Sequence, residues 1–195
     1  MVQGNDDEAR IAGLVDENAQ LRAALAEARA RIVELEQLAD TDTLTPLPNR
    51  RAFLRRLEAV VQYAARHNTP AAILYIDLDG LKQINDDYGH AAGDAVLLQL
   101  AGLLTENLRT TDMVARIGGD EFGLILDHLS EAAAAAKAQA LAKRVSEQPF
   151  KLADLNVSIR VTIGLAAVRP GDSVASLIER ADAAMYANRI YRSHI

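Results

Sequence analysis

Two short acidic segments hold the residues of this sequence that are best suited to chemistry. Asp77-Leu78-Asp79 follows an apolar run, and Asp120-Glu121 follows the paired glycines Gly118 and Gly119. Hard divalent cations such as Mg²⁺ prefer carboxylate oxygens and often bridge to substrate phosphates. The glycines would leave room for phosphates to approach the backbone. Each segment alone is also typical of an ordinary turn, so a cation and phosphate site requires that the two segments lie together.

Periodic and alternating apolar residues predict the elements that would position these segments. Helices are expected over residues 50–67, from Gly80 onward, over about 93–108, over 131–147 and over 174–189. Strands are expected over residues 71–76, 113–117, 122–126 and 156–168. The second and third strands would form a hairpin at Gly118-Gly119, which makes the sheet at least partly antiparallel. Interspersed helices and strands of this kind indicate an α+β fold.

A heptad repeat runs through the N-terminal part of the chain. Its a and d positions are filled, in chain order, by Ile11, Leu14, Asn18, Leu21, Leu25, Ala28, Ile32, Leu35 and Ala39. Four unbroken heptads predict a parallel coiled-coil homodimer, in which Asn18 fixes the register and the two-stranded state. Glu17 would face Arg22 of the second helix, and Arg31 would face its Glu36 in the same way. The alternative is a single amphipathic helix that packs on its own domain.

The heptad pattern ends at Asp42, where the d position should be apolar. Pro46 and Pro48 follow, and prolines end one helix and begin another. We therefore divide the chain into a dimerisation helix, residues 1–40, and a folded domain, residues 41–195.

Composition excludes several classes of protein. The 195 residues are 50% hydrophobic and 25% charged, which is typical of a globular chain. A net charge of -6 without a basic run argues against a nucleic-acid polymer as partner. The absence of cysteine excludes disulfides and thiolate metal sites. No apolar run approaches about 18 residues and no signal-peptide pattern is present, so we expect a cytoplasmic protein without direct membrane insertion.

Four motifs resemble, in order, those of the GGDEF-domain family of diguanylate cyclases. They are residues 42–51, 76–86, 88–94 and 116–122, the last reading Arg-Ile-Gly-Gly-Asp-Glu-Phe. The resemblance covers about residues 41–195. It implies a palm-like nucleotidyl cyclase domain, with a central, mainly antiparallel sheet flanked by helices and preceded here by the coiled-coil helix. It also implies the activity, which is the condensation of two GTP into cyclic di-GMP with release of pyrophosphate.

The resemblance further implies metal ligands and a catalytic base. The ligands would be Asp77, the backbone carbonyl of Leu78, Asp120 and Glu121. They would hold Mg²⁺, two ions per active site, with Mn²⁺ as a substitute. Asp120 would also take the proton from the ribose 3′-hydroxyl, a step that a bound metal ion favours.

Contacts to GTP are implied in the same way. The substrate-binding residues would be Lys82, Asn85, Asp94, Gly118, Gly119 and Arg189. Arg189 stands where the family usually has Lys, and Arg192 would give a second phosphate contact. Guanine presents N1–H and an amino group, which a carboxylate such as Asp94 accepts, whereas adenine presents an unpaired acceptor at N1. We interpret His90 as an orienting imidazole, because the carboxylates already supply a base.

A final motif concerns regulation. Arg109-Thr110-Thr111-Asp112 resembles the Arg-x-x-Asp site at which the family binds its product, cyclic di-GMP, as an inhibitor. The alternative is a surface ion pair between Arg109 and Asp112, which would contribute little. For the whole chain, the alternatives to an active cyclase are a non-catalytic cyclic di-GMP receptor and a scaffold. Because the acidic residues are all present, the sequence favours the enzyme.

Overall fold

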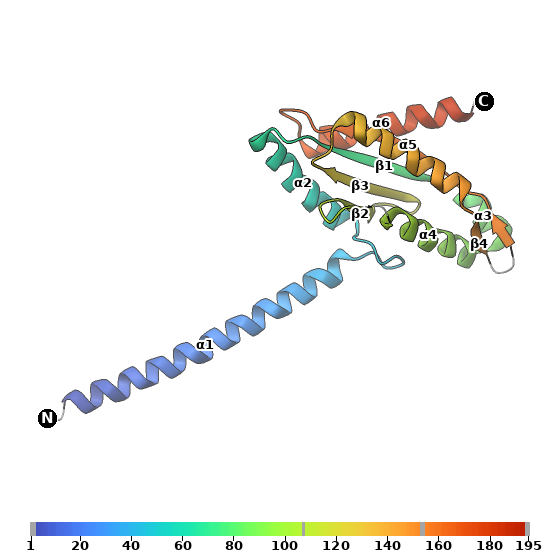
Figure 1. Cartoon of the computed structure of the whole chain (residues 1–195). Helices are drawn as coiled ribbons and strands as arrows, with labels where there is room; N and C mark the ends of the chain where they lie inside the picture. The colour runs from blue at the N-terminus through green and yellow to red at the C-terminus, as the bar shows by residue number, and fades with distance from the viewer. Residues whose placement is uncertain (1–2, 107, 153–154, 194–195) are drawn as a thin grey trace. The chain divides into compact units, whose positions relative to one another are not determined.

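An antiparallel sheet forms the centre of residues 41–195 (Figure 1). The structure, a computed structural model, describes residues 3–106, 108–152 and 155–193. The strands of the sheet, in spatial order, are β2 (Met113–Arg116), β3 (Glu121–Asp127), β1 (Ala71–Asp79) and β6 (Arg160–Ala167). Every neighbouring pair is antiparallel. The α+β fold expected from the sequence is therefore confirmed.

Alternation along β1 divides the core into two layers. Ala72, Leu74 and Ile76 pack into one apolar cluster, and Ile73 and Tyr75 pack into the other. The first cluster is completed by α4 (His90–Thr105) and α5 (Glu131–Glu147), with α3 (Leu81–Tyr88) at its margin. The second is completed by α2 (Arg50–His67) and α6 (Val174–Ser193). Because successive side chains of a strand point to opposite faces, Asp77 lies on the same face as Tyr75, toward α6.

Most predicted elements agree with the structure to within a few residues. α2 and α5 have the predicted bounds, and each begins after a side-chain cap, Asn49 and Ser130 respectively. β1 continues to Asp79, and α4 begins at His90, three residues earlier than predicted.

The single strand predicted over residues 156–168 is wrong, because its first residues lie in a second, two-stranded sheet and its later residues form β6. The sequence analysis missed this second sheet. It consists of β4 (Phe150–Leu152) and β5 (Leu155–Val157). The side-chain amide of Gln99 on α4 holds it by donating to the carbonyl of Lys151 and accepting from its N–H, each over 2.9 Å. Three-residue strands are too short for an alternation signal, so this hairpin depends on a contact between distant segments.

The N-terminal unit is the single helix α1 (Gln3–Asp40). Four heptad leucines and isoleucines within it are about half exposed or more: Leu14 56%, Leu21 62%, Leu25 51% and Ile32 54%. The side chains of Ile11, Leu35 and Glu36 lie outside the described residues. Exposed apolar side chains at heptad positions are typical of a helix that pairs with a second helix. The pairing itself stays a prediction. Within the described ranges, no helix is long and apolar enough to cross a bilayer.

Candidate active site

The two acidic segments lie side by side at one end of the sheet. Asp77 of β1 and Glu121 of β3 are directly opposite in the antiparallel register, so their side chains share one face. The N–H of Leu78 donates to the carbonyl of Asp120 over 3.0 Å, which fixes Asp120 beside the end of β1. We call Asp77, Asp120 and Glu121, with the Leu78 carbonyl, the acidic centre. The two segments thus meet at one end of the two central strands, as a cation site requires.

Burial and neighbouring charges act on Asp77 of the acidic centre. It is only 5% exposed. Burial raises the pKa of Asp77, the guanidinium of Arg189 lowers it, and the charges of Asp120, Asp79 and Glu121 raise it again, to about 6. The Nη2 atom of Arg189 lies 2.6 Å from Asp77 Oδ1. In this structure, the positive charge beside Asp77 comes from the C-terminal helix.

The oxygen donors of the acidic centre suit a hard divalent cation. Carboxylates placed close together repel one another, and a cation added between them relieves that repulsion. As they stand, no three acidic or imidazole side chains of the described residues come close enough to enclose an ion. Arg189 holds one oxygen of Asp77, and Asp79 accepts a hydrogen bond from the Thr162 hydroxyl over 2.9 Å. The oxygen donors of the acidic centre therefore suit a metal ion, but their side chains would have to move to enclose one.

The two glycines of the hairpin differ in what they allow. A Cβ on Gly118 would lie 2.4 Å from Oε2 of Glu121, whereas a Cβ on Gly119 would meet nothing within 4 Å. Gly118 therefore makes room for the side chain of Glu121 itself. Only Gly119 leaves open space of the kind that the sequence analysis expected for both glycines.

Arg116 braces the hairpin and was missed by the sequence analysis. Its Nε and Nη2 donate to the carbonyl of Gly119 over 3.2 and 2.7 Å, and its Nη1 lies 3.0 Å from Asp42 Oδ1. Burial raises the pKa of Asp42, but hydrogen bonds from Thr45 and Arg116 outweigh burial and hold it below the ordinary value. The segment after α1 is thereby linked to the residue that precedes Asp120. Both ends lay within motifs quoted above, but 74 residues separate them.

The residues assigned to the base and phosphates gather on α3 and α4. Lys82 and Asn85 lie on α3, and Asp94 lies in the first turns of α4. Lys82 and Asp94 are exposed, whereas Oδ1 of Asn85 is buried and has no hydrogen-bond partner among the described residues. We call these three residues the α3–α4 edge. His90, the first residue of α4, is exposed.

The C-terminal helix reaches the site as the sequence suggested. Asn188 donates its side-chain amide to the carbonyl of Ile163 over 2.8 Å, which anchors α6 to β6. The next residue, Arg189, is thereby held at Asp77. The side chain of Arg192 lies outside the described residues.

The Arg-x-x-Asp motif forms a closed turn with an unexpected partner. The N–H of Arg109 donates to Asp112 Oδ2 over 3.2 Å, and Lys137 Nζ of α5 lies 2.9 Å from the same oxygen. The side chain of Asp112 is 2% exposed. Across the described residues, the ion partner of Asp112 is Lys137, and the alternative pair with Arg109 is not formed. Sequence spacing gave no signal for Lys137, because it lies 25 residues away.

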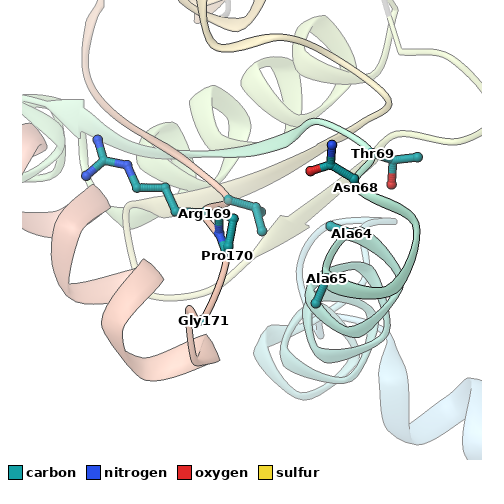
Figure 2. A pocket seen from close by; sticks show the side chains of 8 residues that line it. Ala64, Ala65, Asn68, Thr69, Arg169, Pro170 and Gly171 are labelled. Carbon is teal, nitrogen blue, oxygen red and sulfur yellow. The ribbon is translucent and has the colours of Figure 1, made fainter.

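A small hollow lies at the other end of β1 (Figure 2). Ala64, Asn68, Thr69 and Gly171 are among its lining residues, and its volume is about 130 Å³. In Figure 2 the side chain of Arg169 extends away from Asn68 and Thr69. Ligand pockets in proteins usually measure about 300 Å³ or more, so this hollow is too small for a nucleotide.

Comparison with known proteins agrees with this arrangement. The profile of the family described as "Diguanylate cyclase, GGDEF domain" matches residues 39–192. The chain belongs to this family. It is 43% identical over 182 residues, 91% of its length, to the bifunctional diguanylate cyclase/cyclic di-GMP phosphodiesterase MucR of Pseudomonas aeruginosa. It is 40% identical over 175 residues, 89% of its length, to the diguanylate cyclase TpbB of the same species.

The chain spans only part of these curated relatives, 26% of MucR and 40% of TpbB. Solved structures are matched more completely. The coiled coil and GGDEF domain of DgcB from Caulobacter crescentus, in complex with c-di-GMP, has a TM-score of 0.79 and 31% identity over 90% of this chain and 94% of that one. The diguanylate cyclase SiaD of Pseudomonas aeruginosa, in complex with its activator SiaC, has a TM-score of 0.75 and 29% identity over 97% and 78%.

Proposed function

We propose that this chain is a diguanylate cyclase, which condenses two GTP into cyclic di-GMP with release of pyrophosphate. The observation that carries the proposal is the acidic centre, where buried Asp77 and half-buried Asp120 and Glu121 lie at adjoining ends of β1 and β3. Family membership supports the same activity. A non-catalytic receptor would not need these carboxylates. The cytoplasmic location expected from composition stays a prediction.

The acidic centre would hold Mg²⁺ or Mn²⁺ through Asp77, the Leu78 carbonyl, Asp120 and Glu121, with two ions per site. When bound, the metal would lower the cost of deprotonating the 3′-hydroxyl and stabilise charge on the α-phosphate and pyrophosphate. Asp120 would accept the proton of the 3′-hydroxyl. The 3′-oxygen would then bond to the α-phosphorus of the second GTP, and the bond from that phosphorus to pyrophosphate would break.

The remaining site residues would bind and orient GTP. Lys82 and Arg189 would pair with phosphate oxygens, so Arg189 would exchange its contact with Asp77 for one with the substrate. Open space at Gly119 would admit phosphate near the backbone. Asn85 and Asp94 would contact the guanine base.

This function is tested by incubating the purified protein with GTP and Mg²⁺ and resolving the products by chromatography. Cyclic di-GMP and pyrophosphate are expected. A scaffold would form neither, and a GTP analogue with Mg²⁺ would leave its melting temperature unchanged, because only a ligand of the folded state raises it.

Dimerisation by α1 is the second part of the proposal. Each site would hold one GTP, and the product has two-fold symmetry, so two domains must face each other. The exposed heptad side chains of α1 and the coiled coil in the DgcB structure support pairing. Pairing would raise the local concentration of one domain near the other to about millimolar.

Deleting residues 1–40 should therefore lower specific activity most at nanomolar protein, by about 100-fold. The remaining unit, residues 41–195, contains both core clusters. A truncated protein as active as the full chain at nanomolar concentration would show that α1 is not what brings the domains together.

Product inhibition at Arg109 and Asp112 is the third part of the proposal. Arg can pair bidentately with O6 and N7 of guanine, and Asp112 can accept from N1–H and the amino group. The Lys137 contact would have to give way to the base. Arg109→Ala should stay active and lose inhibition by micromolar cyclic di-GMP; equal inhibition of variant and wild type would place the site elsewhere.

A further inference from the structure

The contact between α3 and α4 contains a steric feature that the motifs do not explain. Gly93 is buried in α4. A Cβ placed on it would lie 2.0 Å from Oδ1 and 3.0 Å from Cγ of Asn85, and 3.2 Å from Cδ1 of Leu81. Real Cβ atoms essentially never approach another heavy atom closer than 3.0 Å. The amide of Asn85 therefore occupies the volume that any side chain at residue 93 would fill.

Backbone conformation gives no other reason for a glycine here. Gly93 is not among the glycines with positive φ, in contrast to Gly89 just before α4. Glycine inside a helix is less favourable than alanine, so helix propensity alone would favour a substitution. The space for Asn85 is the feature that requires Gly93.

The Asn85 amide that fills this space lacks a hydrogen-bond partner for its oxygen. Asn85 Oδ1 is buried, and no described residue donates a hydrogen bond to it. A buried acceptor without a partner is costly, and a ligand that supplies a donor removes that cost. Asp94, the second base-contacting residue, directly follows Gly93 in α4. Both residues proposed to contact the base therefore adjoin Gly93, Asn85 in space and Asp94 in the chain.

We infer that Gly93 is a specificity-determining positioning residue, which keeps the Asn85 amide seated between α3 and α4 where its oxygen accepts a hydrogen bond from the guanine base. This inference rests on the proposed binding of guanine by Asn85. A methyl group at residue 93 would push the amide out of its seat. The flexible end of Leu81 needs to shift only by tenths of an ångström, so Asn85 is the contact that decides the outcome.

The test is a double-mutant cycle on the full chain, read out as the Kd for a non-hydrolysable GTP analogue with Mg²⁺. Gly93→Ala and Asn85→Ala should each raise the Kd about tenfold. In the Asn85→Ala background the space is empty, so adding Gly93→Ala should change the Kd by less than about twofold. Gly102→Ala is the matched control, because a Cβ on this second α4 glycine meets nothing within 4 Å.

Each outcome decides a different claim. Equal effects of Gly93→Ala in both backgrounds, or no effect in either, would overturn the inference. If the wild type does not bind the analogue, or Asn85→Ala binds it as well as the wild type does, the proposed base contact fails instead. If Gly93→Ala does not fold, Asn85→Ala should restore folding in the double variant, and a double variant that stays unfolded contradicts the inference.

Discussion

The acidic centre and the α3–α4 edge differ in how their polar groups are paired. At the acidic centre, Asp77 is buried on a strand and already holds a cation, the guanidinium of Arg189. At the α3–α4 edge, Lys82 and Asp94 are exposed and the oxygen of Asn85 lacks a partner. The groups proposed to act in the chemical step are fixed by the sheet, and small displacements of reacting groups are costly. The groups proposed to contact the base lie on α3 and α4, and they leave hydrogen-bonding capacity for a ligand.

Among the substitutions outside the acidic centre, Arg116→Ala should have the largest effect on turnover. The guanidinium of Arg116 fixes the carbonyl of Gly119, directly before Asp120. A displacement of about 1 Å at reacting groups can cost about 100-fold. Arg116→Ala should therefore lower kcat by about that factor with a smaller change in the KM for GTP, measured by steady-state kinetics.

Arg56→Ala is the matched control for Arg116. Arg56 also pairs with an aspartate, Asp127 at the opposite end of β3, over 3.1 Å. Arg56→Ala should keep kcat within about twofold of the wild type, because this partly buried pair stabilises the fold at the end of β3 away from the acidic centre. If both variants lose activity equally, Arg116 acts through general stability and not through the hairpin.

The charges around Asp77 predict a smaller effect, which is a change in the free energy of unfolding. Without metal, the pKa of Asp77 is raised from 3.8 to about 6. The folded protein therefore holds a proton that the unfolded chain releases, and the free energy of unfolding falls as pH rises through this window. In EDTA at pH 7, Asp77→Asn should be more stable than the wild type by on the order of 2 kcal/mol. At about pH 3.5, below both pKa values, this difference in stability should vanish.

Arg189→Met is the complementary variant, because it should lower the free energy of unfolding that Asp77→Asn raises. Arg189 lowers the pKa of Asp77, so its loss raises that pKa further and lowers the stability of the metal-free protein at pH 7. Urea unfolding at the two pH values measures both variants. A less stable Asp77→Asn protein at pH 7 would show that the ion pair with Arg189 outweighs the burial of Asp77.

The sequence predicted features that depend on local signals. Apolar periodicity gave the bounds of α2 and α5, and the apolar run gave most of β1. The hairpin predicted the pairing of β3 with β2, whereas the pairing of β3 with β1, which joins the two acidic segments, was only a requirement of the proposed site. Fold, family and acidic residues therefore followed from motifs and periodicity.

Long-range contacts could not be read in the same way. Asp42 with Arg116, Gln99 with Lys151 and Asp112 with Lys137 are each separated by 25 residues or more. The periodicity of apolar residues does not indicate which distant side chain fills a given space. For the same reason, the sequence showed Gly93 as a motif residue but not the amide of Asn85 that lies against it.

The contrast between chemistry and base recognition is tested most directly by the rate of cyclic di-GMP formation at saturating GTP and Mg²⁺, measured by chromatography for Asp120→Asn and Asn85→Ala. Asp120→Asn should form no detectable product while it melts like the wild type, because it keeps the shape of the side chain and loses the base and metal ligand. Asn85→Ala should recover most of the wild-type kcat at saturation, with a KM raised about tenfold. Turnover by Asp120→Asn at the wild-type rate would contradict the assignment of the acidic centre as the catalytic site.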